Sequence, residues 1–194
     1  MKPRVFIIHG WDGSPRRDWI PWLSRELTRR GFRVHALSMP NPAVPKIKPW
    51  INRVAKRVGR ADEQTYFVGH SIATRTILKY LEGLPKTTKV GGCVFVAGWF
   101  TLKGLDADSK RIAKPWMQQK INFAKIKSHT RKFVAIFSDN DPFVPLSDRA
   151  RFHKNLGAKI ITEHKMGHYT DESHITRIPS ALKKIIKMSA RTNL

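Results

Sequence analysis

The chain has 194 residues, 41% of them hydrophobic, and its 37 Lys and Arg residues outnumber its 14 Asp and Glu residues, giving a formal net charge of +23. This composition argues against a disordered chain, and the length suits one globular domain, residues 1–194, better than two. The apolar runs are too short for a signal peptide or a membrane span, and the single cysteine, Cys93, has no partner for an internal disulfide, so we expect a soluble, cytoplasmic protein.

Six segments are typical of short buried strands, namely residues 4–10, 33–39, 65–70, 92–98, 132–138 and 158–164. Several are continuously apolar, as expected for parallel strands that are covered on both faces. Helical patterns fall between them, at about residues 18–30, 47–60, 72–83, 147–156 and 177–189, and Asp18 is the expected N-cap of the first helix. This alternation predicts an α/β fold with a doubly wound, mostly parallel sheet of about six strands.

Residues 99–130 interrupt this alternation, because they are more than a simple crossover needs. They contain Gly104, the acidic pair Asp106 and Asp108, and Pro115. We expect a short excursion from the sheet with one or two brief helices.

The positive charge is dispersed along the chain. Arg53, Lys56 and Arg57 fall on one face of a predicted helix whose other face is apolar, and no run of Lys and Arg exceeds two residues. Such faces are more typical of solvated helices than of a dedicated nucleic-acid site, although we expect weak, non-specific and salt-sensitive contact with RNA or DNA. A basic rim that steers anionic substrates is a further hypothesis.

A serine, an acid and a histidine follow the third, fifth and sixth predicted strands. Ligands bind beyond the carboxyl ends of the strands in such a sheet, so these side chains are expected to meet there. Ser71 lies in the pattern G-x-S-x-A, from Gly69 to Ala73, which is a variant of the nucleophile elbow. The simpler alternative is that Ser71 only caps the following helix, but a cap requires no acid and no base elsewhere.

Each partner of the serine has alternatives. Asp141 is followed directly by a proline that stiffens the backbone, whereas Asp139 is nearer the strand end and suits a turn. His168 follows Gly167 beyond the last strand, at the place where a base is needed. His164 and His174 are the other histidines of this region, one at the end of the strand and one in a helical turn.

The remaining candidate residues surround this triad. The backbone amides of Ile72 and Trp11 are the expected oxyanion hole, and Trp11, Trp99, Phe100 and Phe143 are candidates for a substrate-binding wall. The histidines and the cysteine do not form the ligand spacings of a metal site, and no phosphate-binding glycine motif is complete, so we predict no metal and no cofactor.

The segments VFIIHGWDGSP, FVGHSIA and SDNDPFVP, together with the pair GH at residues 167–168, resemble those of small, lidless serine hydrolases of the α/β-hydrolase superfamily that are related to retinoblastoma-binding protein nine. The resemblance runs from the first strand to the last loop, and it implies a catalytic triad of Ser71, Asp141 and His168. Ala73 departs from the family, because many members have glycine there. The high positive charge is a second departure.

These observations predict a serine hydrolase that cleaves a small-molecule ester or amide through an acyl-enzyme. The family resemblance implies esterase-like or peptidase-like activity. The alternative is a non-catalytic protein that keeps the fold as an interaction scaffold and associates with nucleic acid through its basic surface.

Overall fold

The computed structural model describes residues 2–190 and contains one six-stranded sheet in that range. All neighbouring strands are parallel, in the order β2-β1-β3-β4-β5-β6. The strands are β1 (Arg4–Ile8), β2 (Arg33–Leu37), β3 (Thr65–His70), β4 (Gly92–Val96), β5 (Phe133–Ser138) and β6 (Lys159–Glu163). The predicted α/β fold is therefore confirmed, and within the described residues the sheet is parallel throughout.

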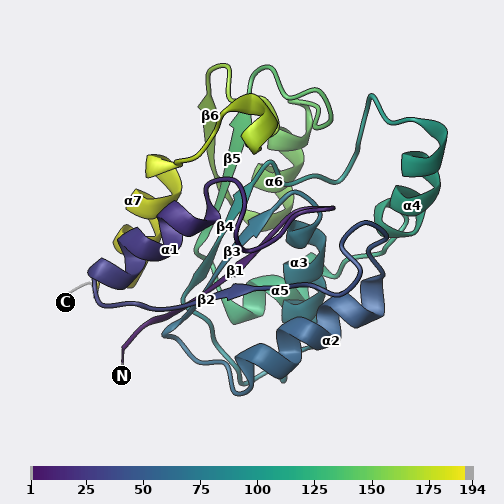
Figure 1. The fold of residues 1–194 in the computed structure, drawn as a ribbon. Coiled ribbons are helices and arrows are strands. Elements are labelled where there is room, and N and C mark those ends of the chain that lie inside the picture. The colour runs from purple at the N-terminus through teal and green to yellow at the C-terminus, as the bar shows by residue number, and fades with distance from the viewer. Residues whose placement is uncertain (1, 191–194) are drawn as a thin grey trace.

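Helices cover both faces of this sheet (Figure 1). The described residues form α1 (Ile20–Arg29), α2 (Ile47–Val58), α3 (Ala73–Gly83), α4 (Ala107–Met117), α5 (Phe123–His129), α6 (Asp148–Leu156) and α7 (Pro179–Ser189), together with a short 3₁₀ helix, η1 (Asp171–Ser173). Helices α1 and α7 contact each other on one side of the sheet, and α2, α3, α5 and α6 lie on the other side (Figure 1).

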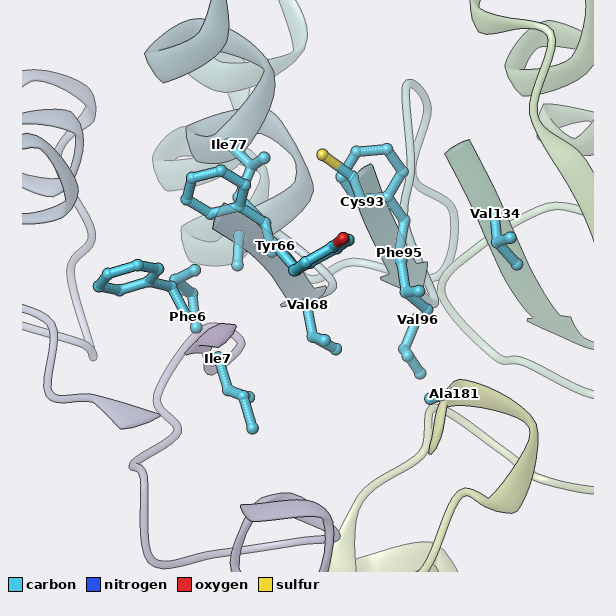
Figure 2. Packing of buried hydrophobic residues seen from close by; sticks show 14 of the residues in the cluster. Phe6, Ile7, Tyr66, Val68, Ile77, Cys93, Phe95, Val96, Val134 and Ala181 are labelled. Atoms are coloured by element: carbon cyan, nitrogen blue, oxygen red, sulfur yellow. The ribbon is translucent and has the colours of Figure 1, made fainter. Parts of the chain in front are cut away.

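The hydrophobic core lies on both faces of the sheet, because successive side chains of a strand point to opposite faces. Figure 2 shows Phe6 on the side of Ile77, which belongs to α3, while Ile7 and Val68 point to the opposite side, where Ala181 of α7 lies. All five side chains are completely buried. The central strands are apolar without interruption because both of their faces are covered by helices.

The predicted strands and the five helices between them are all present, but several of their ends differ from the prediction. The first, second and fourth strands end at Ile8, Leu37 and Val96, two residues earlier than expected, because the next residues turn into loops at the sheet edge. The prediction of Asp18 as an N-cap is wrong. Trp19 occupies that position without a side-chain cap, and Asp18 instead accepts a 2.8 Å hydrogen bond from the amide of Asp171.

The excursion after β4 contains two helices, α4 and α5, as expected. Asp106 caps α4 by accepting a 2.8 Å hydrogen bond from the amide of Ser109. The end of α4 is held from α3 by the buried guanidinium of Arg75, which donates to the carbonyls of Trp116 at 2.5 Å and Gln119 at 2.9 Å. Burial lowers the pKa of Arg75 to about 10, which still leaves it charged at neutral pH. The excursion is thus tied to the helix that follows Ser71.

None of the helices formed by residues 2–190 has the length and hydropathy required to cross a membrane.

Candidate active site

Ser71 occupies a sharp turn between β3 and α3. Its φ angle is +52°, which is uncommon for a residue other than glycine and is typical of a nucleophile elbow. Its amide donates a 2.8 Å hydrogen bond to the carbonyl of Val96 in the neighbouring strand, which fixes the turn against the sheet. The chain approaches itself closely here. A Cβ atom at Gly69 would lie 2.6 Å from Cδ1 of Ile77 and 3.3 Å from the backbone of Ala73, so any side chain at position 69 would force Ile77 and the start of α3 to shift.

The structure brings Ser71, His168 and Asp141 together from three strand ends. Oγ of Ser71 lies 3.0 Å from Nε2 of His168, and Nδ1 of His168 lies 2.9 Å from Oδ2 of Asp141. With the proton on Nδ1 donated to the carboxylate, Nε2 is free to accept the hydroxyl proton of Ser71. This arrangement can convert a weakly nucleophilic alcohol into a reactive one.

The carboxylate of Asp141 is held rigidly and is only 3% exposed. Its Oδ1 accepts hydrogen bonds from the amides of Phe143 at 2.8 Å and Val144 at 2.9 Å, which leaves Oδ2 for the imidazole. Two backbone donors and one imidazole donor therefore satisfy a charge that would otherwise be costly to bury.

Asp139, the alternative acid, has a different role. It accepts hydrogen bonds from Nδ1 of His164 at 2.5 Å and from the amide of Lys165 at 2.8 Å. The next residue, Asn140, accepts a 2.8 Å hydrogen bond from the amide of Gly167. Both side chains therefore join the loop after β5 to the loop that carries His168, and neither lies in the hydrogen-bond chain to Ser71.

A second histidine, His70, lies directly behind the imidazole of His168. The two ring centroids are 5.2 Å apart, and Nε2 of His70 donates a 2.8 Å hydrogen bond to the carbonyl of His168. Burial, followed by the positive field of His168, lowers the pKa of His70 to about 3. His70 is therefore neutral at physiological pH, and it positions the backbone of His168 without competing for its proton.

The two amides expected to form an oxyanion hole are available for an incoming ligand. Within residues 2–190, the backbone N–H groups of Trp11 and Ile72 have no hydrogen-bond acceptor. Trp11 follows β1 in the loop beside the elbow, and Ile72 is the N-cap residue of α3. The helix dipole at this end of α3 also favours negative charge.

A cavity of about 300 Å³ opens over Ser71 and His168. Three of the four predicted aromatic residues, Trp11, Trp99 and Phe143, contribute to its wall. The indole N–H of Trp99 donates a 3.2 Å hydrogen bond to Oγ of Ser71, so this side chain touches the hydroxyl itself. Phe100 does not line the cavity. Its ring packs against Phe152, with the centroids 4.5 Å apart, so we leave it out of the candidate binding residues.

Metal-ligating side chains do not converge around this cavity. No group of three or more His, Cys, Asp or Glu residues within residues 2–190 is arranged to hold a metal ion. Cys93 is completely buried in β4, and burial raises the pKa of its thiol, so the thiol is not a nucleophile here. The absence of a metal and of a cofactor stays a prediction from the sequence.

Comparison with known proteins agrees with this geometry. The profile of the family described as serine hydrolase matches residues 5–187, which is nearly the whole chain. The chain belongs to the serine hydrolase family. The resemblance predicted from the sequence motifs is thereby confirmed, as is the assignment to the α/β-hydrolase superfamily.

Two relatives and one protein that shares the fold illustrate the range of similarity. YdeN of Bacillus subtilis (strain 168) is 29% identical over 183 residues, which are 92% of each chain, and its crystal structure superposes with a TM-score of 0.90 at 25% identity, covering 98% of this chain and 100% of that one. Serine hydrolase RBBP9 of Rattus norvegicus is 25% identical over 86% of this chain and 87% of its own. Est1E of Butyrivibrio proteoclasticus with bound ferulic acid shares the fold, with a TM-score of 0.70 at 17% identity over 95% of this chain and 88% of its own.

Sequence reasoning missed the groups that support the three central side chains. His70 was given no role, although it stands next to Ser71 in the sequence. Trp99 was expected only in a substrate wall, and its hydrogen bond to Ser71 was not foreseen. The polar run from Ser138 to Asp141 directly after a buried strand was a usable signal, because polar side chains at that place need partners.

Proposed function

We propose that this serine hydrolase cleaves a carboxylic ester or amide through an acyl-enzyme on Ser71. The hydrogen-bond chain from Ser71 through His168 to Asp141, with contacts of 3.0 and 2.9 Å, is the observation that carries the proposal. His168 accepts the hydroxyl proton at Nε2 while Oγ attacks the carbonyl carbon. The carbonyl oxygen becomes an oxyanion, and the amides of Trp11 and Ile72 donate to it.

The tetrahedral intermediate then collapses. The proton on Nε2 of His168 passes to the departing alcohol or amine, the bond between the carbonyl carbon and the leaving group breaks, and the acyl group stays on Oγ of Ser71. A water molecule then attacks the carbonyl carbon of this ester while Nε2 of His168 accepts one of its protons. The second collapse returns that proton to Oγ and releases the carboxylic acid, so the enzyme is regenerated without a co-reactant.

An ester substrate is supported by the relatives. Est1E, with which this chain shares the fold, is described with bound ferulic acid, an aromatic carboxylic acid. The wall formed by Trp11, Trp99 and Phe143 offers aromatic surface next to Ser71, which suits an acyl or leaving group with an apolar body.

Labelling with a fluorophosphonate probe tests the proposal. The probe should attach to Ser71, and Ser71→Ala should abolish both the labelling and the hydrolysis of p-nitrophenyl esters. Ser147→Ala is a matched control, because Ser147 is an exposed serine before α6 whose side chain makes no capping hydrogen bond. A folded parent protein that neither reacts with the probe nor hydrolyses any ester of a C2 to C10 chain-length series would overturn the proposal.

The bond type is decided by a second comparison. A p-nitrophenyl ester and a p-nitroanilide of the same acyl group give kcat/KM for an ester and for an amide. Both reactions release a nitroaromatic product that is followed by absorbance. We expect the ester to react faster, because the p-nitrophenolate departs without needing the proton from His168. An anilide hydrolysed as fast as its ester would instead indicate a peptidase-like enzyme.

A further inference from the structure

The cavity over Ser71 is acidic although the protein is strongly basic. Among the residues that line it, four carry carboxylates, Asp12, Asp18, Asp106 and Glu172, whereas Arg17 is the one lining Lys or Arg within residues 2–190. Thus 4 of the chain's 14 acidic residues line the cavity, whereas among the many Lys and Arg residues of the described range only Arg17 does. The hypothesis of a basic rim that steers anionic substrates is wrong for this wall.

The carboxylates are not neutralised by ion pairs. Within residues 2–190, none of the four lies within 4.0 Å of a Lys or Arg nitrogen. Arg17 is directed to Asp171 instead, with 3.7 Å between Nε and Oδ2. Hydrogen bonds from Ser109 lower the pKa of Asp106, so its charge persists well below neutral pH. Burial raises the pKa of Asp18, which weakens its negative charge. We therefore expect the exposed carboxylates to contribute more to the attraction of a charged substrate.

The aromatic side chains of the same wall provide an independent indication of the ligand's charge. The faces of Trp and Phe rings attract cations, and quaternary ammonium groups are bound by aromatic walls of this kind. Trp11, Trp99 and Phe143 line the same cavity as the four acidic residues, and Trp99 touches the hydroxyl of Ser71 through its indole N–H. Carboxylates and aromatic faces together suit an ammonium group that is attached to an apolar body.

We propose that the substrate of this site carries a positive charge, as an ammonium group of its acyl or leaving portion, which lies against these carboxylates while its carbonyl meets Ser71. This inference rests on the proposed hydrolase function and adds the substrate class to it. The basic exterior does not contradict it, because at physiological ionic strength exposed charges are screened over about 8 Å and the lining groups act at contact range.

Three p-nitrophenyl esters of nearly equal shape test the inference. Their acyl groups are 5-(trimethylammonio)pentanoyl, which is cationic, 6,6-dimethylheptanoyl, which is neutral, and 5-carboxypentanoyl, which is anionic. Because an exposed ion pair changes a binding constant by about twofold to fivefold, four carboxylates should raise kcat/KM for the cationic ester at least tenfold over the neutral ester. The anionic ester should be the poorest, and 0.5 M NaCl should reduce all three differences.

Charge-neutral variants identify the groups responsible. Glu172→Gln and Asp106→Asn should each reduce the cationic-to-neutral ratio of kcat/KM about twofold to fivefold. Asparagine at position 106 can still accept the hydrogen bond that caps α4. Asp108→Asn is the matched control, because Asp108 is an exposed acid on the same helix that pairs with Arg111 and does not line the cavity. An equal loss of the ratio in Asp108→Asn would show that only the overall charge matters and would overturn the inference.

Binding to the Ser71→Ala variant separates this inference from the proposed function. Calorimetry with the methyl esters of the cationic and neutral acids measures recognition even when no turnover is possible. Tighter binding of the cationic ester supports the inference whether or not the parent hydrolyses esters. Equal or weaker binding of the cationic ester overturns it, while Ser71-dependent hydrolysis of the neutral ester would leave the proposed function intact.

Discussion

Replacing Trp99 with phenylalanine should slow the second half of the proposed reaction more than the first. The indole N–H of Trp99 donates to Oγ of Ser71 over 3.2 Å. During acylation Oγ forms a bond to carbon and becomes a poorer acceptor, so this hydrogen bond gives the transition state no advantage. During deacylation Oγ departs with growing negative charge, and a donor held at that position stabilises it.

The magnitude follows from the contact. A hydrogen bond between neutral groups contributes about 0.5–1.5 kcal/mol, and 3.2 Å is at the long end of the N–H···O range, so we take about 0.5–1 kcal/mol. This corresponds to a deacylation rate constant that is about twofold to fivefold lower. The ring of Trp99 is almost completely buried, and the guanidinium of Arg75 lies 5.8 Å from its centroid. Phenylalanine retains an aromatic face for that contact.

Burst kinetics with p-nitrophenyl acetate measure both steps, because the burst reports acylation and the steady state reports deacylation. The ratio of the acylation to the deacylation rate constant should rise about twofold to fivefold in Trp99→Phe. Trp11→Phe is the matched control. It removes an indole N–H from the same cavity wall, but that group donates to the carbonyl of Ala43, so the ratio should not rise. Deacylation as fast in Trp99→Phe as in the parent would refute this reasoning.

Three further predictions concern the groups around Ser71. Asp141→Asn should lower kcat/KM by about 10⁴-fold, because the amide favours the tautomer of His168 with its proton on Nε2; activity within tenfold of the parent would contradict this role. His70 has a folded pKa of about 3 against 6.5 in the unfolded chain, so the unfolded state binds the proton first and stability is lost as pH falls below about 6.5. That loss amounts to about 2 kcal/mol between pH 7 and 5, so urea denaturation should show a fall in stability over this range that is larger in the parent than in His70→Gln by this amount. Gly69→Ala should cost about 1–3 kcal/mol of unfolding free energy because its methyl group meets Ile77 at 2.6 Å; a midpoint equal to that of the parent would refute the crowding.

The three central side chains were predictable because two constraints act on them together. Parallel strands bring their carboxyl ends to one edge, and a serine nucleophile needs a base and an acid at that edge. Ser71, His168 and Asp141 satisfied both constraints from the sequence, and they are in hydrogen-bond contact in the structure. Asp139 and Asp141 were harder to separate, since the choice depends on which carboxylate faces the imidazole.

The cavity wall was not predictable in the same way. Its residues come from the loops after β1, β5 and β6, from the end of β3 and the turn after it, from the excursion after β4 and from η1, and their mutual placement depends on tertiary packing. Asp18 shows the difficulty. Its local sequence suits a helix cap, but its carboxylate accepts a hydrogen bond from the backbone amide of Asp171, which is 153 residues away in the chain. Phe100 was misplaced for a related reason, because it neighbours Trp99 in the sequence but packs against Phe152.

The hydroxyl, imidazole and carboxylate that we assign to bond cleavage stand on loops fixed to the sheet, whereas one side of the cavity comes from residues 102–109, before and at the start of α4. Descendants of a common ancestor can therefore acquire new preferences by exchanging this one segment while inheriting the reactive centre unaltered. A protein engineer could therefore randomise this one segment to change selectivity. Its two ends are fixed to the fold, because Asp148 accepts hydrogen bonds from the amides of Phe100 and Thr101 before it and Arg75 donates to the carbonyl of Trp116 after it.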